Sequence, residues 1–192
     1  MKHNTAEVAE LQPDYLGFIF YAKSARNFTG SAPNLPHSVK RVGVFVNASL
    51  KDISEKIKTF KLDVVQLHGD ESPEFCQALK GAEIWKVFSI RDSFNFNRLT
   101  LYDTVVDKFL FDTKGKERGG NGFTFNWSAL AGYPLTKPFI LSGGIGLTEI
   151  DSLQQILKTE LPIYAIDVNS KFEDRPGLKN TRQLTQFMSY FE

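Results

Sequence analysis

The chain has 192 residues, of which 42% are hydrophobic and 23% charged, and its formal net charge is +1. This composition is typical of one soluble domain spanning residues 1–192 and excludes a disordered or fibrous protein, while the balanced charge argues against nucleic acid or a membrane surface as a partner. The single cysteine rules out an internal disulfide, which suits the cytoplasm, and the longest apolar run, Tyr15–Ala22, is far shorter than the ~18 residues needed to cross a bilayer.

The first half of the chain alternates short apolar runs with longer amphipathic ones. In chain order it is predicted to contain helix Thr5–Leu11, strand Tyr15–Phe20, strand Arg41–Val46, helix Leu50–Phe60, strand Val64–Leu67, helix Ser72–Leu79 and strand Ile84–Ser89. Within Leu50–Phe60 the apolar residues recur at spacings of three and four, which defines a helix face. Ser72 and Pro73 are a typical N-cap and first-turn proline for the helix that follows.

The second half continues the same alternation. Its predicted elements are a weaker helical stretch over Phe94–Tyr102, strand Phe109–Phe111, a short helix opening at Asn126, strand Pro138–Leu141, helix Leu147–Leu157, strand Tyr164–Val168 and helix Thr181–Phe191. A polar, glycine-rich loop separates the strand at Phe109–Phe111 from Asn126.

The repetition of strand and helix, with strands that are apolar almost throughout, predicts a parallel sheet covered on both faces. The seven strands follow one another at even spacing, which favours an α/β fold of the (β/α)8 TIM-barrel type over an open doubly wound sheet. Such a barrel closes with eight strands. Because the chain opens on the helix Thr5–Leu11, we expect the first β-strand of the barrel to be missing from this chain.

Two loops at the expected carboxyl ends of the last strands have the composition of a phosphate site. Gly143 and Gly144 follow the strand at Pro138–Leu141, and Asn169 and Ser170 follow the final strand. Glycine allows backbone N–H groups to approach a phosphate closely, and the last two loops of a full barrel often hold one. The alternative is that the glycines only form a tight turn.

Other polar residues are expected around the same mouth. Asp112 ends a strand beneath the glycine-rich loop, which suits a general acid under a lid, although a lone Asp is more often a surface or capping residue. Arg26 could clamp a carboxylate or be a solvated surface residue. Gln66 and His68 lie two residues apart and therefore face the same side of their strand. For His68, a structural role through a hydrogen bond is a simpler interpretation than catalysis.

Cys76 is interpreted as a buried core residue. The sequence has neither an HExxH motif nor a cysteine cluster, so we expect no metal site.

Several of these segments occur together, in order, in one known family. They are Gly17-Phe-Ile-Phe followed by Ser24 and Arg26, Val42-Gly-Val-Phe-Val-Asn47, Val65-Gln-Leu-His-Gly69, the strand ending in Asp112, Gly119-Gly120 leading to Trp127, Leu141-Ser-Gly-Gly144, Ile166-Asp-Val-Asn-Ser170, and Pro176-Gly177 with Lys179. The pattern covers nearly the whole chain and resembles the phosphoribosylanthranilate isomerase family of tryptophan biosynthesis.

The resemblance implies a cofactor-free Amadori rearrangement of N-(5′-phosphoribosyl)anthranilate to 1-(2-carboxyphenylamino)-1-deoxyribulose 5-phosphate. It implies that Asp112 acts as general acid on the ring oxygen and that Arg26 binds the anthranilate carboxylate. Gln66, His68 and Asp167 would line the substrate, with Asp167 beside the sugar hydroxyls. Gly143, Gly144, Asn169 and Ser170 would hold the phosphate. The implied partner is this small-molecule substrate, bound by a monomer, or by a dimer formed through the open barrel edge.

The sequence departs from the family pattern in its proton-transfer machinery. The family's general base is a cysteine that ends the first strand, and this chain has no such segment, since Met1 stands where the family continues after that cysteine. Either the coding sequence begins about one strand upstream or the natural protein is shortened. In both cases we expect the 192-residue polypeptide to be weakly active or inactive. Smaller departures are Asn121 in the glycine-rich loop and Lys171 after Ser170.

Two other functions are weighed against the isomerase. One is a non-catalytic phosphosugar- or anthranilate-binding protein built on an opened barrel. The other is a neighbouring phosphate-binding barrel such as indoleglycerol-phosphate synthase, which is disfavoured because its catalytic lysine and longer N-terminal extension are not recognised here.

Overall fold

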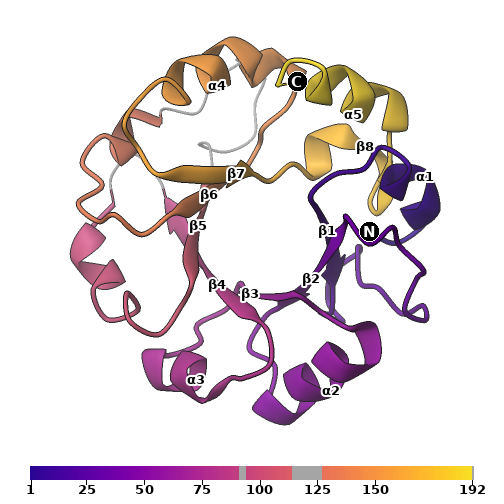
Figure 1. The fold of residues 1–192 in the computed structure, drawn as a ribbon, viewed down its shortest axis with the longest axis horizontal. Coiled ribbons are helices and arrows are strands. Elements are labelled where there is room, and N and C mark those ends of the chain that lie inside the picture. The colour runs from indigo at the N-terminus through magenta and orange to yellow at the C-terminus, as the bar shows by residue number, and fades with distance from the viewer. Residues whose placement is uncertain (91–93, 114–126, 192) are drawn as a thin grey trace.

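In the part of the chain that the structure describes, seven parallel strands curl around a common axis, with the helices outside them (Figure 1). The structure is a computed structural model that describes residues 1–90, 94–113 and 127–191. The strands are β1 Tyr15–Ile19, β2 Lys40–Phe45, β3 Val64–Leu67, β4 Glu83–Ile90, β5 Lys108–Thr113, β6 Phe139–Ser142 and β7 Ile163–Ile166. Each pairs in parallel with the next in chain order, so β1 and β7 are the edges of the sheet. The predicted (β/α) barrel lacking one strand is confirmed.

The remaining elements connect or flank these strands. The α-helices are α1 Thr5–Ala9, α2 Leu50–Phe60, α3 Pro73–Ala78, α4 Ile150–Ile156 and α5 Thr181–Met188. Short 3₁₀ turns occupy Phe96–Leu99, Trp127–Leu130, Leu147–Glu149 and Ser170–Phe172, and a small antiparallel hairpin consists of β8 Glu173–Arg175 and β9 Leu178–Lys179. Among the described residues, no helix is both long and apolar enough to cross a membrane.

Local sequence explains the helices that were predicted best. Ser49 caps α2 by accepting a hydrogen bond from the backbone N–H of Asp52 (3.1 Å), and the helix ends where Lys61 adopts a left-handed conformation. Ser72 caps α3 in the same way through the N–H of Phe75 (3.2 Å). These caps set where the helix after each strand begins.

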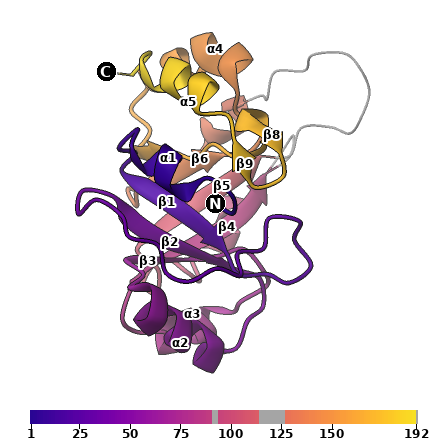
Figure 2. The same ribbon diagram turned by 90° about the vertical axis from the view of Figure 1, so that its right-hand side faces the viewer.

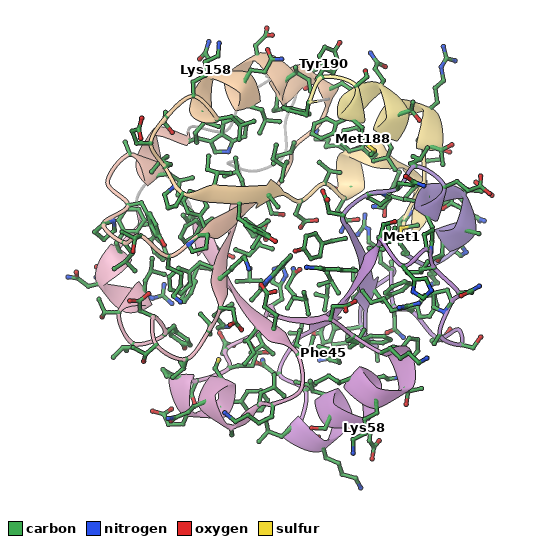
Figure 3. All side chains as sticks on the ribbon, viewed as in Figure 1. Met1, Phe45, Lys58, Lys158, Met188 and Tyr190 are labelled. Atoms are coloured by element: carbon green, nitrogen blue, oxygen red, sulfur yellow. The ribbon has the colours of Figure 1, made fainter. Side chains whose placement is uncertain are left out.

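The apolar side chains form two separate buried clusters, because alternate strand residues point to opposite faces of the sheet. The smaller cluster fills the inside of the barrel and consists of Val42, Val64, Trp85, Val87, Leu110 and Ile140. The larger cluster lies between the sheet and the helices, and Phe45 of β2 belongs to it, pointing toward α2 (Figure 3). Both faces of the sheet are therefore covered, as the continuous apolar strands predict.

Several boundaries differ from the sequence-based prediction. β5 extends through Asp112 to Thr113, and β7 ends at Ile166 rather than Val168. The helix expected over Leu147–Leu157 begins as a 3₁₀ turn before α4, and only a 3₁₀ turn at Phe96–Leu99 forms within the weak stretch Phe94–Tyr102. The β8–β9 hairpin was not predicted.

Candidate active site

The carboxyl ends of the strands bring four polar side chains to one mouth of the barrel. His68 follows β3, Asp112 lies near the end of β5, Ser142 ends β6 and Asp167 follows β7. The strand register places Asp112 directly opposite Ser142, so both lie at the same level. Ser142 was part of the predicted glycine loop but was not assigned a role.

Asp112 and His68 lie next to each other across the mouth. The His68 Nε2 atom is 3.4 Å from Asp112 Oδ2, and the side chains are 35% and 18% exposed, respectively. Gln66 lies two residues before His68 on the same face of β3 and is buried in the barrel. The predicted acid is therefore partly exposed, within reach of a ligand, and has a histidine side chain beside it.

Asp167 is the more deeply enclosed carboxylate. Ser142 Oγ donates a hydrogen bond to Asp167 Oδ2 (2.8 Å), and the backbone N–H of Asp167 donates to the carbonyl of Leu141 (2.8 Å). Burial raises the pKa of Asp167, and the nearby charge of Asp112 acts in the same direction. An environment that favours the protonated form at one of two neighbouring carboxyl groups is suited to proton transfer.

Arg26 is held in place by the chain rather than free in solvent. Its Nε atom is 2.8 and 3.1 Å from the two carboxylate oxygens of Glu173, and its Nη2 atom is 2.6 Å from Oε2. Glu173 also accepts from Lys179 Nζ (3.0 Å) and from the backbone N–H of Gly177 (3.1 Å). Although burial opposes its charge, the hydrogen bonds from Arg26 and Lys179 hold the pKa of Glu173 below its usual value.

The two predicted phosphate loops lie against each other. Gly143 and Gly144 have φ angles of +93° and +66°, which glycine adopts without strain. A Cβ added to Gly146 would lie 3.2 Å from the Cβ of Lys171, so the loop after β6 touches the loop after β7. Lys171 itself lies in the 3₁₀ turn Ser170–Phe172, a right-handed conformation that a lysine adopts without strain.

Cys76 lies away from this mouth. It is fully buried in α3, within the cluster between sheet and helices. Burial raises the pKa of its thiol to about 11, so the thiolate is disfavoured at neutral pH. The prediction of a core role for Cys76 is confirmed. The predicted glycine-rich lid falls within residues 114–126, outside the described residues.

The sequence-based prediction did not name Glu173 and gave Lys179 no role, although both connect several of the predicted residues. Lys179 Nζ donates to the backbone carbonyl of Asn169 (2.9 Å) as well as to Glu173. The available signal was Pro176-Gly177, a dipeptide typical of a tight turn between two short strands. Gly177 adopts a φ of +85° there.

Comparison with known proteins identifies the family. Residues 2–190 match the family described as N-(5′-phosphoribosyl)anthranilate (PRA) isomerase. The isomerase of Parabacteroides distasonis is 43% identical over 195 aligned residues, covering 96% of this chain and 86% of that protein. Among solved structures, the isomerase from Thermotoga maritima is 30% identical with a TM-score of 0.79, covering 96% of this chain and 90% of that one. A second solved isomerase, in complex with reduced 1-(o-carboxyphenylamino)-1-deoxyribulose 5-phosphate, is 27% identical with a TM-score of 0.78, and the match again covers 96% of this chain and 90% of that one. This chain belongs to the N-(5′-phosphoribosyl)anthranilate isomerase family.

Proposed function

We propose that this barrel mouth carries the Amadori rearrangement of phosphoribosylanthranilate, with Asp112 as its general acid. The proposal rests on one observation: a partly exposed carboxyl group at a strand end lies 3.4 Å from His68 and opposite the Ser142–Asp167 pair. Asp112 gives its proton to the furanose ring oxygen, the bond from that oxygen to C1′ breaks, and a Schiff base forms between C1′ and the anthranilate nitrogen. Loss of the C2′ proton gives an enolamine, which becomes the ketone when C1′ is protonated.

The binding roles follow the charges of the substrate. Arg26 binds the anthranilate carboxylate, because a guanidinium matches a carboxylate with two parallel hydrogen bonds. The backbone at Gly143, Gly144, Asn169 and Ser170 holds the phosphate, and Asp167 lies beside the sugar hydroxyls. Gln66 and His68 line the space between them. The bound product analogue of the solved relative has the same carboxylate and phosphate groups.

The position of Cys76 bears on the second proton transfer. The family's base is a cysteine, and Cys76 is enclosed between sheet and helices with a thiol pKa of about 11. We therefore infer that Cys76 is not the base of this rearrangement.

A paired assay separates the enzyme from the alternative, a non-catalytic phosphosugar-binding barrel. Turnover is followed by the fluorescence decay of phosphoribosylanthranilate at high protein concentration against a protein-free blank. Binding of the reduced product analogue is followed by calorimetry. We expect saturable binding together with a decay above the blank that disappears when the substrate lacks its phosphate. Binding with no decay above the blank supports the binding protein instead.

We also propose that residues 1–192 form one domain, and that the protein works in the cytoplasm without a cofactor, as a monomer or as a dimer that pairs through the edge strands β1 and β7. These two strands form the edges of the sheet in the described part of the chain, and unpaired edges invite association. Light scattering at several concentrations gives the oligomeric state, and a substitution of Tyr164, which lies on β7, should weaken a dimer that uses those edges.

A further inference from the structure

Arg26 and Glu173 meet in a way that leaves part of the guanidinium free. Nε and Nη2 form one edge of the guanidinium, and both donate to Glu173. A guanidinium carries five N–H donors in a planar fork, so the edge formed by Nη1 and Nη2 faces away from Glu173. The Arg26 side chain is 28% exposed, whereas that of Glu173 is 3% exposed. The buried carboxylate thus lies behind an arginine whose other edge can reach a ligand.

Glu173 is itself fixed by the β8–β9 hairpin. Its Oε1 atom accepts from Lys179 Nζ and from the N–H of Gly177, while Arg26 approaches from the other side. The hairpin is held in turn by Asn4, whose side chain accepts from the Lys179 N–H (3.0 Å) and donates to the Lys179 carbonyl (2.9 Å). Figures 1 and 2 show this hairpin beside the N-terminal segment and β1. The carboxylate therefore has little freedom to follow Arg26 if the arginine moves.

Lys179 extends the network to the loop after β7. Its ammonium group donates to the backbone carbonyl of Asn169 (2.9 Å) and to the side-chain oxygen of the same residue. The chain of contacts from Arg26 through Glu173 and Lys179 to Asn169 thus runs from the loop after one edge strand to the loop after the other. Its charges sum to one positive, so the cluster keeps a net attraction for an anion.

We propose that Glu173 is a positioning residue that presents the free edge of Arg26 to the substrate carboxylate, and that Lys179 ties this clamp to the phosphate loop at Asn169. The inference rests on the proposed binding roles of Arg26 and of that loop. It differs from the opposite possibility, in which Glu173 competes with the substrate for Arg26. A positioning carboxylate strengthens binding of the ligand carboxylate, whereas a competing one weakens it.

The test compares two ligands in each variant. One is the reduced product analogue, and the other is the matching anilino compound that lacks the carboxyl group but keeps the sugar phosphate. The ratio of their dissociation constants reports the carboxylate contact alone, because a loss of folded protein affects both ligands alike. In the unmodified chain we expect the carboxylate to improve binding by about ten- to a hundredfold, the range of a charge-assisted hydrogen bond.

Glu173→Gln should lower this carboxylate preference by at least about fivefold, and Glu173→Asp, which keeps the charge, should recover part of it. Asp174→Asn is the matched control: it makes the same chemical change on the same hairpin, at an exposed residue bound by Asn180 (2.8 Å), and should leave the preference unchanged. An unchanged or increased preference in Glu173→Gln overturns the inference, since the carboxylate would then be neutral or competing.

Arg26→Gln distinguishes failure of this inference from failure of the proposed function. It should abolish the carboxylate preference; if it does not, Arg26 is not the carboxylate clamp and its proposed role fails first. Lys179→Met should weaken both ligands by a similar factor, because it releases Asn169 in the phosphate loop. If Lys179→Met leaves both affinities unchanged, the link between clamp and phosphate loop is wrong.

Discussion

The two ends of the barrel carry different polar side chains, and these serve different purposes. At the end where the strands begin, the rings of Tyr15 and Trp85 meet edge to face at 5.0 Å, and Tyr15 lies 6.4 Å from Tyr164. Glu83 accepts a hydrogen bond from the Trp85 indole (2.6 Å) and pairs with Lys108, whose ammonium lies 4.2 Å from the centre of the Tyr164 ring. At the mouth, the corresponding positions hold His68, Asp112, Ser142 and Asp167.

The difference is visible within a single strand. Lys108, Leu110 and Asp112 point to the same inner face of β5, because side chains alternate along a strand. Lys108 packs on a ring and pairs with Glu83, Leu110 is fully buried, and Asp112 remains partly exposed beside a histidine. One end is thus closed by paired charges and aromatic rings, and the other keeps donors and acceptors available for a ligand. The comparison predicts that changes at the mouth affect ligand and rate, whereas changes at the opposite end affect stability.

The largest expected effect on rate is at Asp112. Asp112→Asn keeps the shape of the side chain but removes the transferable proton, so turnover of phosphoribosylanthranilate should fall by roughly 10²–10⁴-fold. Fluorescence decay measures the rate, and thermal unfolding should show little change. Asp151→Asn, on an exposed residue in the first turn of α4, is the control. Equal rates for Asp112→Asn and the unmodified chain would mean that another group supplies the proton.

The largest expected effect on stability is at the opposite end. Trp85 is 4% exposed and its indole donates to Glu83. Trp85→Ala should lower the free energy of unfolding by about 3–5 kcal/mol, the range for removing a large buried aromatic side chain. Urea titration measures this loss. For the protein that remains folded, affinity for the product analogue should be unchanged; a selective loss of affinity would contradict the separation of the two ends.

The sequence predicted the elements that depend on local chemistry. The bounds of α2 agree with the prediction because a regular apolar spacing coincides with the Ser49 cap. The end of β5 was placed too early because Asp112 interrupts an apolar run, although a polar side chain at the mouth is compatible with a strand. Asp112 was therefore recognised as a candidate site residue because it is polar, and for the same reason the end of β5 was placed too early.

Long-range contacts explain what the sequence did not predict. The β8–β9 hairpin carries charged residues that give no strand pattern, and it is held by Arg26 and by Asn4, which lies 175 residues from Lys179. The prediction placed Arg26 and Asn169 at the mouth but could not join them, because the link passes through Glu173 and Lys179. The approach of the Gly146 and Lys171 loops likewise appears only once the chain is folded.

The carboxylates of Asp167 and Glu173 predict opposite dependences of stability on pH. Burial raises the pKa of Asp167, so its ionisation in the folded state costs stability as the pH rises from the usual Asp range through its raised pKa. Asp167→Asn should therefore stabilise the protein at neutral pH, with the gain disappearing in acid. The other groups whose charge influences Asp167 remain in the variant, and they are Lys179, Asp112 and His68. Urea titrations at several pH values measure the difference.

Glu173 supplies the matching case. Arg26 and Lys179 overcome the effect of burial and lower its pKa, so its stabilisation is present above the usual Glu range and is lost as the pH falls through its lowered pKa. Glu173→Gln should thus destabilise the protein at neutral pH and approach the unmodified chain in acid. If both variants shift stability in the same direction at neutral pH, the assignment of opposite shifts is wrong.

The smallest expected effect is at the contact between the two edge strands. The hydroxyl groups of Tyr15 and Tyr164 are 2.7 Å apart, and this bond connects β1 to β7 at the end of the barrel opposite the site. Tyr164→Phe removes the bond but keeps the ring beneath Lys108, so unfolding should become easier by about 0.5–1.5 kcal/mol. Because Tyr164 is 45% exposed, water can replace part of the lost interaction, which favours the lower end of that range. Affinity for the product analogue should stay constant. A change in this affinity would show that the contact between β1 and β7 is coupled to the mouth.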